Sequence, residues 1–188
     1  TKKVLKTAGI VSASAAATYF LIGNFFYYVT LTKKGLENPF VAKIASGNGK
    51  KDEERLRLDA IKETGKDWFA SVSKEKLAIK SSNSDKILHA DFIFPERPSD
   101  VYVIVIHGYT SSPAGMGIYA KKYHELGYNV LTPSLNGHAD SESSVITMGW
   151  KDRLDVIDWI NFVVENFPES KIVLHGESMG SATTMMAT

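Results

Sequence analysis

The chain has 188 residues, of which 44% are hydrophobic and 11% aromatic, so it can form a globular domain and is too apolar for a disordered protein. Its net charge of +1, with acidic and basic residues interspersed, provides no broad electropositive field, and we expect no nucleic-acid partner. The absence of cysteine excludes disulfides, thiolate metal sites and a cysteine nucleophile, and we predict no cofactor or metal.

The first segment, residues 1–34, is predicted to be a membrane anchor helix with basic flanks. Residues 8–31 carry no charge, and lysines precede and follow them. A helix of this length spans roughly 36 Å, more than the hydrocarbon core of about 30 Å. Aromatic side chains typical of the membrane interface gather in its second half, at Tyr19, Phe20, Phe25, Phe26, Tyr27 and Tyr28. A cleavable signal peptide and a buried core helix are the alternatives.

The predicted location is therefore the cell membrane, with a single-pass anchor and the following domain on the extracytoplasmic side. Lysines lie at both ends of the apolar run, so the positive-inside rule does not fix this orientation. Residues 35–75 are expected to hold a polar linker, which includes Gly47-Asn48-Gly49, and then an amphipathic helix over residues 51–72. Its apolar face recurs at helical spacing, at Leu58, Ile61, Trp68 and Val72.

Residues 76–188 alternate between strand and helix patterns. Two short strands, over 77–80 and 87–94, are separated by a polar turn and predict a hairpin. Three apolar runs, over 101–106, 129–132 and 171–175, predict buried strands, with helices over about 114–126 and 150–167 between them. We expect the second helix to bury a stripe formed by Trp150, Leu154, Ile157, Ile160, Val164 and Phe167. This order predicts an α/β fold with a mostly parallel sheet flanked by helices.

One motif in this region carries chemistry. Gly176-Glu177-Ser178-Met179-Gly180 is a G-x-S-x-G pattern between the last strand and a helix-compatible segment. In such a turn the serine adopts a strained backbone conformation and exposes its hydroxyl, and the glycines avoid collisions with neighbouring backbone. A His107-Gly108 loop ends an earlier strand. The alternative is a glycine-rich turn with an incidental serine.

These motifs resemble the α/β-hydrolase family, in particular membrane-anchored or exported bacterial hydrolases related to monoacylglycerol lipases and prolyl-oligopeptidase-like enzymes. The resemblance covers about residues 77–188 and implies that Ser178 is the nucleophile. It also implies an oxyanion hole formed by the backbone N–H groups of Tyr109 and Met179, with His107, Gly108, Gly176 and Gly180 as structural motif residues. Glu177 is interpreted as a solvated or pocket-rim group.

The sequence departs from the family in two places. The loop Ser134–Ser141 differs from the Asp-x-Arg-Gly-His-Gly-x-Ser pattern at three positions, which removes a local ion pair, and we interpret His138 as structural. The family places its catalytic acid and histidine after the serine. The residues after Ser178 include neither. We therefore expect the chain to be the N-terminal part of the hydrolase domain, without its C-terminal part and inactive by itself.

The leading hypothesis is a parent enzyme that cleaves small-molecule or lipid-like carboxylic esters through an acyl-enzyme on Ser178. A serine peptidase or acyltransferase would use the same residues, because the fold does not fix the substrate. A non-catalytic, membrane-tethered binding module is the third hypothesis.

Overall fold

The computed structural model describes residues 2–46 and 53–188, and the chain divides into two compact units, residues 1–47 and 48–188. The first unit holds helices α1 (Lys2–Leu31), α2 (Lys33–Leu36) and α3 (Pro39–Ser46). Extended Thr32 separates α1 from α2, and its hydroxyl accepts a hydrogen bond from the Gly35 N–H at 3.0 Å. Residues 39–46 are therefore helical where a linker was expected, and Gly47-Asn48-Gly49 lies outside the described residues.

The expectation of a membrane anchor concerns α1. Among the residues whose side chains the structure describes, no helix combines the length and the apolar character that crossing a membrane requires. The transmembrane prediction is therefore not supported. Polar side chains interrupt the apolar run, and those of Thr18, Asn24 and Thr30 hydrogen-bond to the backbone carbonyl four residues earlier.

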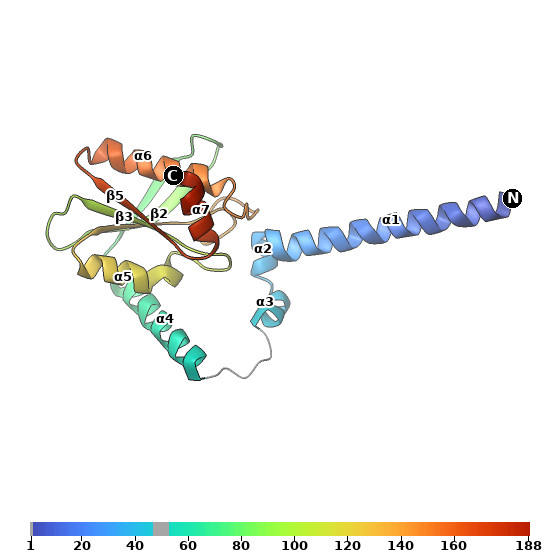
Figure 1. The fold of residues 1–188 in the computed structure, drawn as a ribbon, viewed down its shortest axis with the longest axis horizontal. Helices are drawn as coiled ribbons and strands as arrows, with labels where there is room; N and C mark the ends of the chain where they lie inside the picture. Colours follow the sequence, from blue (N-terminus) through green and yellow to red (C-terminus); the bar gives the residue numbers. More distant parts are fainter. Residues whose placement is uncertain (1, 47–52) are drawn as a thin grey trace. The chain divides into compact units, whose positions relative to one another are not determined.

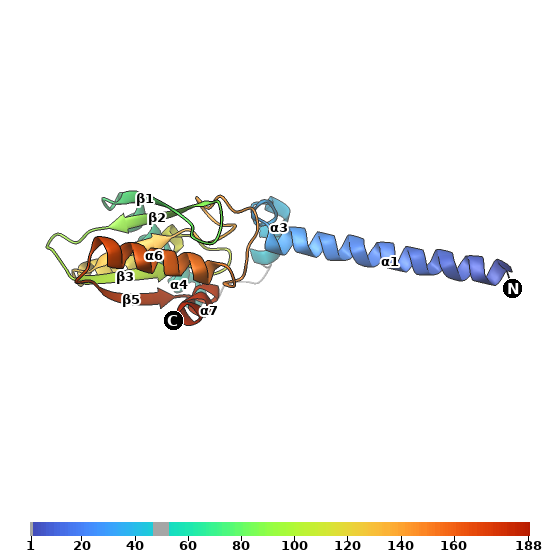
Figure 2. The same ribbon diagram turned by 90° about the horizontal axis from the view of Figure 1, so that it is seen from above.

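The second unit is built on a five-stranded sheet, which Figures 1 and 2 show between helices. Its strands are β1 (Glu75–Lys80), β2 (Ile87–Ile93), β3 (Val101–Ile106), β4 (Asn129–Pro133) and β5 (Lys171–Gly176), in the order β1-β2-β4-β3-β5. β1 and β2 form the expected antiparallel hairpin, and β2 is also antiparallel to β4. Only the β4–β3 and β3–β5 pairs are parallel. The sheet is thus mixed instead of mostly parallel, because the hairpin joins it beside β4.

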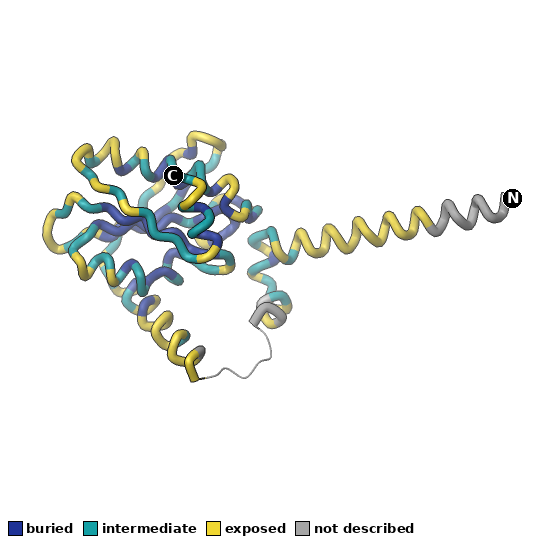
Figure 3. Tube along the Cα trace, viewed as in Figure 1, coloured by how far each residue is buried: buried dark blue, intermediate teal, exposed yellow. Residues whose placement is uncertain are grey.

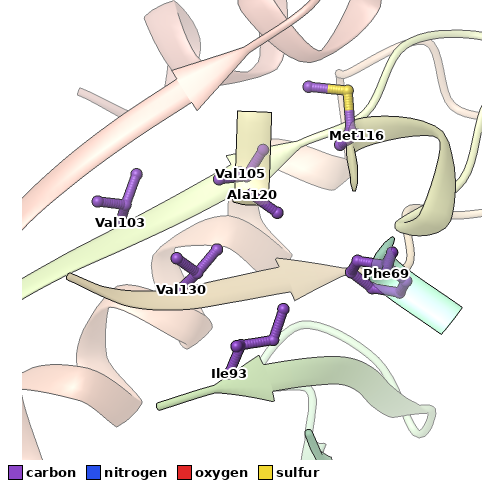
Figure 4. Close-up of a cluster of buried hydrophobic side chains, with 7 residues drawn as sticks. All are labelled: Phe69, Ile93, Val103, Val105, Met116, Ala120 and Val130. Atoms are coloured by element: carbon purple, nitrogen blue, oxygen red, sulfur yellow. The ribbon is translucent and has the colours of Figure 1, made fainter. Parts of the chain in front are cut away.

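Helices cover both faces of this sheet. One face packs against α4 (Glu53–Ser71), the short 3₁₀ helix η1 (Ala114–Met116) and α5 (Gly117–Glu125), and the other packs against α6 (Asp152–Asn166). α7 (Met179–Ala187) follows β5. Successive strand residues point to opposite faces, so β3 gives Val103 and Val105 to the α5 side. There they form a buried cluster with Phe69, Ile93, Met116, Ala120 and Val130 (Figure 4).

The buried faces of α4 and α6 match the predicted stripes only in part. Of the four residues predicted for the first helix, Trp68 and Val72 pack half-buried against the core. In α4 the buried positions are Gly65 and Phe69, whereas Leu58 and Ile61 are about half exposed. Figure 3 shows that the start of α4 is mostly exposed. The reason is a close crossing at Gly65. A Cβ there would meet the backbone of Ile118 and Gly117, so this residue fixes which side of α4 faces α5.

In α6 the buried side chains include Asp152, Val156, Trp159 and Val163, whereas Trp150 is 65% exposed. The predicted stripe omitted this side of α6 because it begins with a charged residue, Asp152. In the structure Asp152 is buried, and both of its carboxylate oxygens accept hydrogen bonds. It accepts hydrogen bonds from the backbone N–H groups of Asn136 and Gly149 at 2.8 and 2.9 Å and from the Thr147 hydroxyl at 2.6 Å. A carboxylate with that many donors can be buried, which a hydropathy pattern does not reveal.

Candidate active site

The nucleophile candidate lies in a sharp turn between β5 and α7. Ser178 has φ 55° and ψ −116°, a left-handed conformation that costs a residue with a Cβ about 1–3 kcal/mol. The turn is fixed from both sides, since the Glu177 N–H donates to the Ile106 carbonyl at 3.2 Å and the Ser178 carbonyl accepts from the Ser181 N–H at 2.9 Å. Ser178 itself is exposed. This strained turn presents a hydroxyl to the surface at the end of the parallel strands.

The two glycines of the motif allow this turn to form. A Cβ at Gly176 would collide with the backbone of Gly180, and a Cβ at Gly180 would collide with the carbonyl oxygens of Ile106 and His107. The start of α7 therefore lies directly against the ends of β5 and β3. Larger residues at either position would move Ser178 away from the β3 loop.

The loop after β3 reaches the same place. β3 and β5 are parallel neighbours, so their carboxyl ends meet at one edge of the sheet. A Cβ at Gly108 would lie 2.9 Å from the Glu177 carbonyl oxygen and 3.3 Å from the Ser178 Cβ. The structure thus brings Gly108, and with it Tyr109, next to Ser178 and Met179. The Ser111 N–H donates to the Gly108 carbonyl at 3.2 Å, which closes this loop into a turn.

His107 is fully buried and both of its ring nitrogens are engaged. Nε2 accepts from the Leu135 N–H at 3.2 Å, so Nδ1 carries the proton that it donates to the Gly108 carbonyl at 2.9 Å. Burial lowers the pKa of His107 to about 4, and the imidazole is neutral at physiological pH. His107 therefore ties the loop of residues 134–141 to the loop beside Ser178.

The loop that departs from the family pattern is held by a different set of bonds. Asn136 is buried, and its side-chain amide donates to Asp152 at 3.0 Å and to Asp155 at 2.6 Å. Burial raises the pKa of Asp155 to about 6, and the Asp152 carboxylate acts in the same direction. His138 is also buried, with Nδ1 2.9 Å from the Asn136 carbonyl and its ring edge-on to His107. The missing ion pair is thus replaced by hydrogen bonds to α6.

A cavity of about 590 Å³ opens at Ser178. One side is formed by Ser178 and Glu177 with the loop of residues 108–111 and Gly115. The other side is a charged face of α4 that sequence reasoning missed, formed by Asp59, Lys62, Glu63 and Lys66. Their helical spacing is typical of any solvated helix face, so the sequence alone contains no signal for this wall. Within residues 2–46 and 53–188, no three His, Cys, Asp or Glu side chains cluster as metal ligands.

Known proteins are similar to this chain over part of its length. No protein-family model matches the chain. A thermostable monoacylglycerol lipase from Bacillus sp. (strain H-257) is 31% identical over 90 residues, which are 45% of this chain and 34% of the lipase. A solved esterase from Pyrococcus furiosus is 30% identical with a TM-score of 0.53, over 60% of this chain and 45% of the esterase.

A serine hydrolase without a lid from Xanthomonas campestris, 20% identical with a TM-score of 0.53, shares the fold over 61% of this chain and 55% of its own. The chain spans only about a third to a half of the lengths of these proteins. In this chain the mixed sheet is flanked by helices, and the G-x-S-x-G turn follows its edge strand β5. Over the matched region, this chain has the fold of the α/β serine hydrolases.

Proposed function

We propose that the protein containing this chain hydrolyses carboxylic esters through an acyl-enzyme on Ser178. The observation that carries the proposal is the exposed Ser178 in a strained turn, with Gly108 packed against it and a cavity in front of it. Two of the similar proteins are a monoacylglycerol lipase and an esterase, which supports an ester substrate. The proposed substrate is a small-molecule or lipid-like ester.

In the proposed reaction the Ser178 Oγ attacks the ester carbonyl carbon while a histidine accepts its proton. The carbonyl oxygen becomes an oxyanion that accepts hydrogen bonds from the backbone N–H groups of Tyr109 and Met179. The C–O bond to the alcohol then breaks, and the histidine returns the proton to the leaving oxygen. Water attacks the acyl-enzyme in the same way and releases the acid. Loss of one such oxyanion donor costs about 2.7–4 kcal/mol of transition-state stabilisation.

The histidine of this scheme is proposed to come from chain beyond these 188 residues. His107 is unsuited, because both of its ring nitrogens are engaged and burial lowers its pKa to about 4. His175 is bonded through Nδ1 to the Tyr123 hydroxyl at 3.1 Å, and His138 through Nδ1 to the Asn136 carbonyl. The match covers only 45% of the solved esterase, and in this fold the acid and the histidine follow the serine in the chain.

A fluorophosphonate probe tests the proposal on the full-length protein. It should label the peptide that contains Ser178 and block hydrolysis of p-nitrophenyl acetate, and Ser178→Ala should abolish both. Turnover of peptide amides instead of esters, or acyl transfer to an alcohol in preference to water, would favour a peptidase or an acyltransferase. A properly folded protein that neither reacts with the probe nor hydrolyses esters would be a binding module, and the proposal would be wrong.

A further inference from the structure

α4 precedes all the strands in the chain, and yet its charged face lines the cavity at Ser178. Asp59, Lys62, Glu63 and Lys66 follow the i, i+3, i+4, i+7 spacing of one helix face. The close crossing at Gly65 and Gly117 fixes this face, since neither glycine leaves space for a Cβ. The position of these charges relative to Ser178 is therefore set by backbone packing.

One of these charges pairs with the residue before the nucleophile. Lys62 Nζ lies 3.5 Å from Glu177 Oε1, with the two side chains 52% and 37% exposed. The neighbouring cation of α4, Lys66, pairs with Glu63 on its own helix at 2.9 Å. Lys62 is thus the α4 cation that compensates the carboxylate at the G-x-S-x-G turn.

The compensation affects the reaction because the proposed oxyanion is the oxygen on the carbon bonded to the Ser178 Oγ, and Glu177 is the residue directly before Ser178. A carboxylate there repels the developing negative charge, and an ammonium paired with it removes most of the repulsion. We propose that Lys62 is a positioning residue that holds and neutralises the Glu177 carboxylate, so that no net negative charge opposes the oxyanion at Ser178. This inference rests on the proposed ester hydrolysis.

The variant Lys62→Met of the full-length protein tests it, because methionine retains much of the side-chain length without the charge. Removing one charge at the rim of a solvated cavity should lower kcat/KM for p-nitrophenyl acetate roughly 3- to 10-fold, mainly through kcat. Lys62→Arg should keep most of the activity. Adding Glu177→Gln to Lys62→Met should restore it, because the uncompensated carboxylate is then gone.

Arg57→Met is the matched control. It removes one positive charge from the same helix, where Arg57 pairs with Glu53 at 2.7 Å with both side chains mostly exposed. Arg57 does not line the cavity at Ser178. The activity of this variant should match that of the unmodified protein.

Salt separates the electrostatic role from a structural one. The Debye length falls from about 10 Å at 0.1 M to about 3 Å at 1 M salt, so the deficit of Lys62→Met should shrink at high salt. A deficit equal to that of Arg57→Met, or one that persists after Glu177→Gln, would overturn the role of Lys62 while leaving ester hydrolysis intact. Absence of hydrolysis by the unmodified protein would overturn both.

Discussion

The strained backbone at Ser178 makes a prediction that does not depend on activity. Replacing Ser178 with glycine should stabilise the fold relative to Ser178→Ala, even though both changes remove the nucleophile. Alanine keeps the Cβ that makes φ 55° and ψ −116° unfavourable, and glycine does not. The comparison of these two variants therefore isolates the strain from the loss of the hydroxyl.

The size of the effect follows from two opposing contributions. Relief of the strained conformation should contribute about 1–3 kcal/mol to the free energy of unfolding. Glycine has more conformational freedom in the unfolded chain than alanine, which lowers the free energy of unfolding by about 0.5–1 kcal/mol. The net gain is about 0.5–2 kcal/mol, and a domain of this size should melt roughly 1–8 °C higher. Because Ser178 is exposed, removal of its Cβ leaves no buried cavity that would offset the gain.

Urea unfolding of the full-length protein, followed by tryptophan fluorescence, measures this difference, because Trp159 is buried in the unit that contains Ser178. The two variants should have equal m-values and different midpoints. If Ser178→Gly proves equal to or less stable than Ser178→Ala, the turn is not strained and the argument for a nucleophile at this position loses its geometric basis.

Three further predictions concern the surroundings of the site. Asp152→Ala should cost about 3 kcal/mol in the free energy of unfolding, because it leaves buried backbone donors unpaired, and a loss below about 1 kcal/mol in urea titration would contradict this. Burial lowers the pKa of His107 to about 4 from 6.5, so up to about 3 kcal/mol of stability, present above pH 6.5, should be lost as the pH falls to 4. Burial raises the pKa of Asp155 to about 6, so on acidification the folded state protonates this carboxylate before the unfolded state does. The folded state therefore gains stability from Asp155 as the pH falls from 6 to 4. Asp155→Asn should therefore make the free energy of unfolding, measured by urea titration, fall more steeply between pH 6 and 4. If the stability profiles of the variant and the unmodified protein are parallel over this range, Asp155 does not oppose the effect of His107. Gly65→Leu should separate α4 from Gly117 and lower the melting temperature by several degrees, as measured by circular dichroism, whereas an unchanged value would mean that the crossing is not close.

Local patterns in the sequence were sufficient to predict the strands and the turn that hold Ser178. An uninterrupted apolar run predicted β3, and the G-x-S-x-G pattern marked the turn between β5 and the following helix. The pattern of residues 171–175 predicted β5 as a strand but not its place at the sheet edge, where Lys171 and Val173 are exposed instead of buried. Part of the requirement for the turn is local, because a Cβ at Gly176 would collide with the backbone of Gly180, whereas Gly180 also has to fit against the carbonyl oxygens of Ile106 and His107. The expectation that the Gly108 loop lies near Ser178 came from the resemblance to the family.

Features that depend on residues far apart in the chain could not be read in this way. The hairpin adds antiparallel strands beside β4, and Asp152 is buried because loops around Asn136 and Gly149 supply its donors. The charged face of α4 lines the site because α4 packs closely on α5, with Gly65 against Gly117. The sequence by itself predicted the turn that exposes Ser178, since the strained serine and the close contact of Gly176 with Gly180 involve near neighbours in the chain. Only the tertiary structure decided which charges face that serine, because the pairing of Lys62 with Glu177 joins residues more than a hundred positions apart.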